Sequence, residues 1–134
     1  MNKYLIFKKE MEGNINNFPM FFAFSDDQFK EGLNKLEVKK NEIISIGAGG
    51  FIRKSDKKKY LKMLENHNQK EEGLLKDDDF LFQGFRYELA NHEFCITYDY
   101  TDTLNCFGLD EESLTKKQIN ILERAKEDYL KNVE

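Results

Sequence analysis

The sequence lacks long apolar segments and has few cysteines. No run of its 134 residues approaches the roughly 20 apolar residues needed to span a bilayer. The first residues carry no long apolar region followed by a small-residue cleavage site, as a signal peptide would. The two cysteines are too few for a disulfide framework, so we expect buried thiols in a reducing compartment. These absences together predict a cytoplasmic protein with no membrane contact.

Motifs for nucleotides and metals are also missing. There is no G-x-x-x-x-G-K-[ST] loop, no G-x-G-x-x-G spacing and no EF-hand loop. His92 and Cys95 have the spacing of a ligand pair, with Cys106 following and His67 elsewhere. Tetrahedral zinc sites usually combine two such close pairs, however. We therefore expect no metal and no cofactor.

The composition predicts one compact domain over residues 1–134. Hydrophobic residues make up 40% of the chain, and twelve Phe and six Tyr can supply a core. The net charge of −4 is uneven along the chain. Residues 1–67 hold thirteen basic and nine acidic side chains, whereas residues 68–134 hold eight and sixteen. Such asymmetry can steer partners, although the folded surface can also mix the two halves.

Hydrophobic periodicity and turn signals predict the elements. Ser25 and Thr115 each begin a capping-box pattern, and Asp77 to Asp79 open a helix with acids that complement its dipole. The last helix is expected to bury Ile119, among other residues. We expect helices over residues 3–16, from 25, from about 56 to 73, from 77 to 92, over a short piece around 101–107, and after 115. Strands are expected at 18–24, buried on both faces, at 43–47, at 51–52 and at 94–98.

This order predicts an α+β fold. A small sheet of three to four strands with a glycine-cornered hairpin would be covered by about five to six helices. The corner holds Gly47, Gly49 and Gly50, with Arg53 and Lys54 just beyond it. One interpretation is an anion-binding site made of free N–H groups and the two cations. The other, which we favour, is a tight hairpin turn with ordinary solvated cations.

Three blocks of the sequence stand out together. They are Asn-Phe-Pro-Met-Phe-Phe-Ala-Phe-Ser at 17–25 with Gln-Phe at 28–29, Ser-Ile-Gly-Ala-Gly-Gly-Phe-Ile-Arg-Lys at 45–54, and Phe-Arg-Tyr-Glu-Leu-Ala-Asn-His-Glu at 85–93. This set resembles a family of small uncharacterised proteins encoded by bacteria, phages and mobile elements. The resemblance covers most of the chain, but the blocks are not catalytic signatures and carry over no functional residue. It implies only action on a host or phage macromolecule.

The third block has the densest set of reactive side chains. His92 is a candidate general base, oriented by a carboxylate such as Asp99 or Glu93, and Arg86 lies in the same stretch. Cys95 and His92 would alternatively form a nucleophile pair. Spacing identifies no third catalytic partner, so we favour a structural histidine and predict no catalytic residue. Arg86, His92 and Asp99 remain a candidate polar site.

We predict a non-enzymatic interaction protein, phage- or mobile-element-encoded, that binds and modulates a host protein such as a defence component. The alternative is a domain that binds nucleotide or nucleic-acid phosphates through Gly47–Gly50 with Arg53 and Lys54. Lysines at 57–59 and 62 add to that basic region, but the pI of about 5.3 disfavours nucleic acid. The acidic residues between 71 and 112 could bind a basic protein surface or imitate a phosphate backbone, but we favour a solvated acidic face. The protein is expected to be a monomer or homodimer.

Overall fold

The computed structural model describes residues 1–132. Its residues form two compact units. The sheet unit comprises residues 10–69. The helical unit comprises residues 1–9 and the chain from Lys70 onward. The expectation of a single domain over residues 1–134 stays a prediction.

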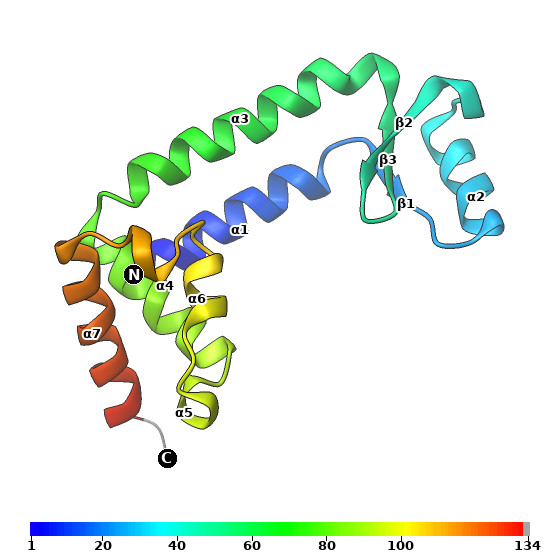
Figure 1. The fold of residues 1–134 in the computed structure, drawn as a ribbon. Helices are drawn as coiled ribbons and strands as arrows, with labels where there is room; N and C mark the ends of the chain where they lie inside the picture. The colour runs from blue at the N-terminus through cyan, green and yellow to red at the C-terminus, as the bar shows by residue number, and fades with distance from the viewer. Residues whose placement is uncertain (133–134) are drawn as a thin grey trace. The chain divides into compact units, whose positions relative to one another are not determined.

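The sheet unit is built on a three-stranded antiparallel sheet with the strand order β1-β3-β2 (Figure 1). Strand β1 is Met20–Phe22, β2 is Ile43–Gly47 and β3 is Gly50–Arg53. Helix α2, Asp26–Leu36, packs against the sheet, and Phe21, Leu36 and Ile43 form the centre of that contact. Two short 3-10 helices, η1 at Lys40–Glu42 and η2 at Lys54–Asp56, flank the β2–β3 hairpin.

Helices α1, Lys3–Asn16, and α3, Lys57–Leu74, each contribute residues to both units. Within the sheet unit, the Phe18 and Tyr60 rings meet edge to face with their centroids 5.5 Å apart. The Asn14 side chain contacts the buried His67 ring at 3.1 Å. Residues 10–16 of α1 and residues 57–69 of α3 therefore belong to the sheet unit, and the Asn14–His67 contact joins them directly.

The helical unit packs α4, Asp78–Asn91, along α7, Lys116–Lys131. Short helices α5, Phe94–Thr97, and α6, Thr101–Asn105, also contact α4, and the 3-10 helix η3 is Glu111–Ser113. The buried side chains of this unit are aromatic and aliphatic: Tyr4, Phe7, Phe80, Leu81, Phe85, Leu89, Phe94, Leu104, Phe107, Ile121, Leu122, Ala125 and Tyr129. The four-residue steps from Leu81 to Leu89 explain how α4 buries one stripe.

Local signals set the starts of three helices. Ser25 Oγ accepts from the Gln28 amide at 3.2 Å, and Thr115 Oγ1 accepts from the Gln118 amide at 3.1 Å. Asp77 Oδ1 accepts from the amides of residues 79 and 80. Each cap satisfies N–H groups that a helix leaves unpaired at its first turn.

The predicted fold class is confirmed: the protein is α+β with a small sheet and a glycine-cornered hairpin. Residues 1–132 contain seven α-helices, where five to six were expected. The difference is the segment 94–98, predicted as a strand, which instead forms helix α5. All three strands of the described chain lie between residues 20 and 53. A strand at 94–98 would have no partner in its own unit for its backbone groups.

Two smaller predictions about burial are wrong. Residues 18–24 were expected to be buried on both faces, but β1 spans three residues and Phe22 is 53% exposed. Its side chain lies on the face of the sheet opposite to Phe21, which packs in the contact with α2. The last helix was expected to bury Ile119, which is 44% exposed, whereas Ile121 is buried. Packing against α4 sets that rotation of α7, and the apolar pattern alone does not distinguish the two isoleucines.

Within residues 1–132, no helix combines the length and apolar character that crossing a membrane requires. A cytoplasmic location stays a prediction.

Candidate functional site

Glu88 is a buried carboxylate in the middle of the helical unit. Its side chain is 1% exposed, on the face of α4 that packs against other elements. Tyr4 Oη donates to Glu88 Oε2 at 3.0 Å, and the Asn91 side-chain amide donates to Oε1 at 3.3 Å. Lys8 Nζ lies 3.8 Å from Oε2. Burying a carboxylate is costly without such partners, so this cluster is a specific arrangement.

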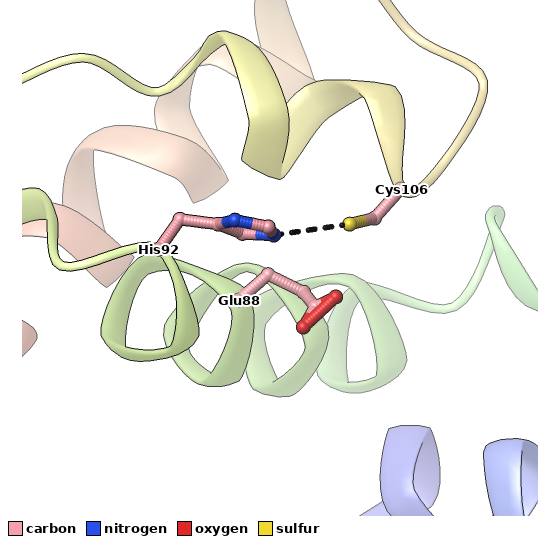
Figure 2. Close-up of side chains that lie close together, drawn as sticks. All are labelled: Glu88, His92 and Cys106. Carbon is pink, nitrogen blue, oxygen red and sulfur yellow. Dashed lines mark hydrogen bonds between the residues drawn. The ribbon is translucent and has the colours of Figure 1, made fainter.

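His92 and Cys106 complete a cluster around this carboxylate. His92 is the C-cap of α4, one turn after Glu88, and its backbone N–H donates to the Glu88 carbonyl. Cys106 is the C-cap of α6, and its Sγ lies 3.5 Å from His92 Nε2. Figure 2 shows the imidazole facing the sulfur, with the Glu88 side chain beside them. One ligand atom from each of the three residues lies within 4.8 Å of the other two.

The thiol of Cys106 is held in its protonated form at neutral pH. Burial of the sulfur raises the pKa of Cys106 to about 12, and the hydrogen bond and negative charge of Glu88 add to the shift. The residue as a whole is exposed, but its sulfur points toward the cluster. A thiolate is the nucleophilic form of cysteine, so this thiol and imidazole do not make an activated nucleophile.

The neighbouring cation and phenol come from α1. The Lys8 ammonium lies over the Tyr4 and Tyr87 rings, 5.4 and 5.8 Å from their centroids. Burial, and then the Glu88 charge, raise the pKa of Tyr4 far above its usual range, so its hydroxyl stays a donor to Glu88. Helix α1 thus fixes the orientation of the carboxylate from outside α4.

The structure places the other residues predicted around His92 in separate contacts. Arg86 Nε donates to Asp128 Oδ2 at 2.8 Å, and its guanidinium lies 4.8 Å from the centre of the Tyr129 ring. Asp99 Oδ1 accepts from the Thr101 amide at the start of α6. A hydrogen bond with the Thr101 side chain, and then the one from this amide, lower the pKa of Asp99. The contacts described for Arg86, Asp99 and His92 are thus made with other residues and not with one another. The polar site made of these three stays a prediction.

The sequence predicts Cys95 as the thiol beside His92, whereas in the structure the Cys106 sulfur lies beside the imidazole. Cys95 is half-buried in α5, and its hydrogen bond with Tyr129 raises the pKa of that phenol. Cys106, eleven positions later, supplies the sulfur next to the imidazole. The spacing of Glu88 and His92, one helical turn, is visible in the sequence, but the approach of Cys106 depends on how α6 packs on α4.

The glycine corner joins β2 to β3 and accommodates aromatic side chains. Gly49 has φ of +81°, and a Cβ there would lie 2.5 Å from the Phe24 ring. Gly47 has φ of +90°, and Gly50 lies against Phe22 and Ile46. These glycines therefore serve the turn and the close approach of rings. Anion binding at this corner stays a prediction.

Arg53 has a defined structural contact next to this corner. Its Nε and Nη2 donate to the Leu36 carbonyl at 3.2 and 2.9 Å, and Nη1 donates to Asp56 Oδ2 at 3.3 Å. The guanidinium thus ties β3 to the C-terminal end of α2, while Lys54 is exposed in η2. A free anion would compete with both of these acceptors for Arg53.

A family model described as "Family of unknown function (DUF7659)" matches residues 3–131. The chain belongs to this family. The resemblance to an uncharacterised family, inferred from the three sequence blocks, is confirmed at that level. No curated protein and no solved structure matches the chain. Membership assigns no activity, so function rests on the geometry described above.

The sheet unit contains a cleft that four phenylalanines help to line, and we call it the aromatic cleft. Its volume is about 770 Å³, and its lining includes Phe18, Pro19, Met20, Phe21, Phe22, Phe24, Gln28, Glu31, Lys35 and Arg53. The α2 members, at 28, 31 and 35, recur at helical spacing and so lie on one face of that helix. The cleft therefore runs between a face of α2 and strand β1.

A second cleft of the sheet unit, the lysine cleft, is lined by Asn14, Lys58, Lys59, Lys62, Met63, Asn66 and His67, with a volume of about 490 Å³. The His67 side chain is 7% exposed, and its Nδ1 is buried without a hydrogen-bond partner. Three ammonium groups beside an unpaired ring nitrogen give this cleft a cationic lining.

Proposed function

We propose that this protein is a non-enzymatic interaction protein, encoded by a phage or mobile element, that binds and modulates a host protein such as a defence component. The observation that carries the proposal is the aromatic edge of the sheet unit. Phe22 and Phe24 are 53% and 78% exposed beside the aromatic cleft. Exposed aromatic side chains that line a cleft are typical of surfaces that bind other proteins.

Strand β1 has one free hydrogen-bonding edge within the sheet. Ala23 N donates to the Gly49 carbonyl, and Phe21 is paired with Phe51 in the same register. Because antiparallel residues alternate, the backbone groups of Met20 and Phe22 point to the opposite side. Strand order β1-β3-β2 leaves that side without a strand of its own sheet.

The free edge and the aromatic cleft fit the same occupant, an extended apolar segment of the partner protein. Such a segment would pair with Met20 and Phe22 as an added strand, while its side chains enter the cleft. Main-chain hydrogen bonds would supply affinity, and the Phe18, Phe22 and Phe24 rings would select apolar side chains. An unprotected apolar edge is otherwise a hazard for aggregation, which a dedicated partner would relieve.

The chemistry of the helical unit also favours binding over catalysis. The thiol of Cys106, whose pKa is about 12, is not the thiolate that a cysteine enzyme requires at neutral pH. His92 Nε2 contacts this thiol at 3.5 Å. The thiol and imidazole of the cluster are therefore not an activated nucleophile pair.

The proposal is tested by capture and peptide binding. The tagged protein is used to capture partners from a host lysate, and overlapping peptides of each captured protein are then titrated against the purified chain. We expect one apolar peptide to bind and to slow amide hydrogen exchange at Met20 and Phe22. Phe24→Ser should lower the affinity for that peptide at least about tenfold, since aromatic anchors dominate such interfaces.

Ile96→Ser is the matched control, because Ile96 is 72% exposed but lies in α5 of the helical unit. This variant should bind the peptide as the unaltered chain does. The free edge of β1 and the aromatic cleft together are the β1 surface. An equal loss of peptide affinity in both variants, or peptide binding without slowed amide exchange in β1, would refute this surface as the interaction site.

A second candidate function, binding of phosphate groups, is favoured by the lysine cleft. The alternative predicted from sequence used Gly47–Gly50 with Arg53 and Lys54, but Arg53 is engaged by Leu36 and Asp56. Lys58, Lys59 and Lys62 instead surround a cleft of their own. Cationic side chains that converge on a cavity attract phosphates with strong salt dependence.

This candidate is tested with a labelled oligonucleotide and with ATP at two salt concentrations. Binding that weakens at high salt and is lost in Lys58→Ala/Lys62→Ala, but kept in Arg53→Ala, would support the lysine cleft. If binding were lost only in Arg53→Ala, with helicity unchanged, the phosphate site would lie at the glycine corner instead. Absence of binding to either probe would exclude both.

A further inference from the structure

We infer that Glu88, His92 and Cys106 form a binding site for a divalent transition-metal ion, with Zn²⁺ the best match. The site lies within the helical unit and is independent of the β1 surface. The sequence predicted no metal because His92 and Cys95 formed a single close pair. Folding supplies a different sulfur and adds a carboxylate, so the donor set becomes one oxygen, one nitrogen and one sulfur.

The backbone holds these donors at metal-ligand spacing. Glu88 and His92 are four residues apart on α4, so their side chains leave the same face of the helix one turn apart. Cys106 comes from the C-cap of α6, and α6 packs on α4. Ligands fixed on two packed helical elements are positioned before the ion arrives.

The distances agree with a tetrahedral ion. With Zn–S of about 2.3 Å and Zn–N of about 2.0–2.1 Å, a tetrahedral angle separates the two ligand atoms by about 3.6 Å. The observed distance between Cys106 Sγ and His92 Nε2 is 3.5 Å. The three ligand atoms lie within 4.8 Å of one another, so small side-chain rotations would bring the Glu88 oxygen to bonding distance from an ion held by His92 and Cys106.

Groups behind the carboxylate orient it as outer partners do in metal sites. Tyr4 Oη and Lys8 Nζ both contact Glu88 Oε2, and the Asn91 amide contacts Oε1. Such outer contacts hold a ligand in its binding orientation and are characteristic of protein metal centres. They also explain why a fully buried glutamate is placed on α4, where an apolar residue would pack more simply.

The donor types select the metal class. Sulfur and imidazole nitrogen favour Zn²⁺ over Mg²⁺ and Ca²⁺, which require oxygen ligands. Three protein ligands leave the fourth tetrahedral position for water. On binding the ion, Cys106 would release its thiol proton to solvent, and the resulting thiolate and the Glu88 carboxylate together would balance the charge of a divalent ion. The Lys8 ammonium is an outer neighbour of that carboxylate.

Cobalt substitution tests the site directly. Co²⁺ is titrated into the metal-free, reduced protein, and absorption is followed from the near ultraviolet through the visible. We expect one equivalent to produce a thiolate-to-cobalt charge-transfer band and the visible bands of a tetrahedral centre. Zn²⁺ should then displace Co²⁺ and abolish both, and isothermal titration with Zn²⁺ should give one ion per chain.

The chain provides its own control because it has two cysteines. Cys106→Ser should eliminate the charge-transfer band. It should also lower the affinity for Zn²⁺ by roughly a hundredfold or more, since even the loss of a group that only orients a ligand costs about 10–100-fold in metal affinity. Cys95→Ser should leave both unchanged. Glu88→Gln retains an acceptor for Tyr4 and should weaken Zn²⁺ without loss of helicity by circular dichroism.

Three results would overturn the inference. They are no Zn²⁺ binding by the intact chain at micromolar ion, unchanged binding in Cys106→Ser, or loss of the charge-transfer band in Cys95→Ser. Each of these readouts is independent of the partner-capture experiment, so the two proposals stand or fall separately.

Discussion

Tyr4 in α1 and Glu88 in α4, 84 positions apart in the sequence, are joined by a hydrogen bond of 3.0 Å. Both side chains are buried, and the bond links the first helix of the chain to the centre of the helical unit. It also fixes the carboxylate on which the proposed metal site depends.

Tyr4→Phe should destabilise the protein by about 1–3 kcal/mol, because the buried carboxylate loses a donor while the ring stays in place. Chemical denaturation with and without the substitution measures the difference. Tyr98→Phe is the control, since Tyr98 is 66% exposed, and it should change the free energy of unfolding by less than about 0.5 kcal/mol. Equal effects of the two changes would contradict an important Tyr4–Glu88 bond.

Gly49→Ala should destabilise the protein by about 1–3 kcal/mol. The new Cβ would meet the Phe24 ring at 2.5 Å, and φ of +81° is unfavourable for alanine. Gly13→Ala is the matched control, because Gly13 lies in α1 with nothing within 4 Å of its Cβ position. That change should stabilise the helix by about 0.5–1 kcal/mol. Thermal denaturation of both variants tests the contrast, and a neutral Gly49→Ala would show that the corner can relax.

Asp77→Asn should reduce stability at neutral pH but not in strong acid. The hydrogen bond from the Lys3 ammonium, and then that from the Phe80 amide, lower the pKa of Asp77. A lowered folded-state pKa means that the contribution is present above the unfolded value of about 3.9 and is lost as pH falls through the folded value. Asparagine still caps α4, so the change isolates the charge.

Urea denaturation from about pH 7 to about pH 2 follows this effect across the ordinary titration range of aspartate. The stability difference between the two proteins should shrink steadily on acidification. Glu112→Gln, at an exposed acid in η3, should show a small difference that does not follow this pattern. A pH-independent deficit in Asp77→Asn would mean that capping, and not charge, accounts for it.

Cys106 should resist alkylation in the metal-free folded protein. With a pKa of about 12, only about one thiol in ten thousand is ionised at pH 8, compared with roughly a quarter for an ordinary cysteine. In a Cys95→Ser background, iodoacetamide should react at least about 100-fold faster in urea than in the native state. The native rate should keep rising with pH up to about pH 10, because ionisation remains far from complete. A plateau near pH 8 would show an ordinary thiol.

Much of the local structure could be predicted because it depends on neighbouring residues. Ser25, Asp77 and Thr115 each cap a helix through amides two or three positions away. The corner at 47–50 forms a hairpin because glycine accepts positive φ. The α+β class follows from these elements and was predicted correctly.

The candidate site was only half visible before the fold was known. Glu88 and His92 share a face of α4 by simple helical spacing, and His92 had been singled out. Proximity along the chain favours Cys95 over Cys106 as the partner of His92. In the structure, Cys95 meets Tyr129 and Cys106 meets His92.

What the sequence determined by itself was therefore the set of short-range features: helix starts, the glycine turn and the apolar stripe of α4. Tertiary structure decided the rest. Residues 94–97 are helical because their unit offers no strand with which they could pair. Arg53 binds the end of α2, where it donates to the Leu36 carbonyl. Local signals act through one or two turns of backbone, whereas a side-chain cluster needs elements that are distant in sequence to pack.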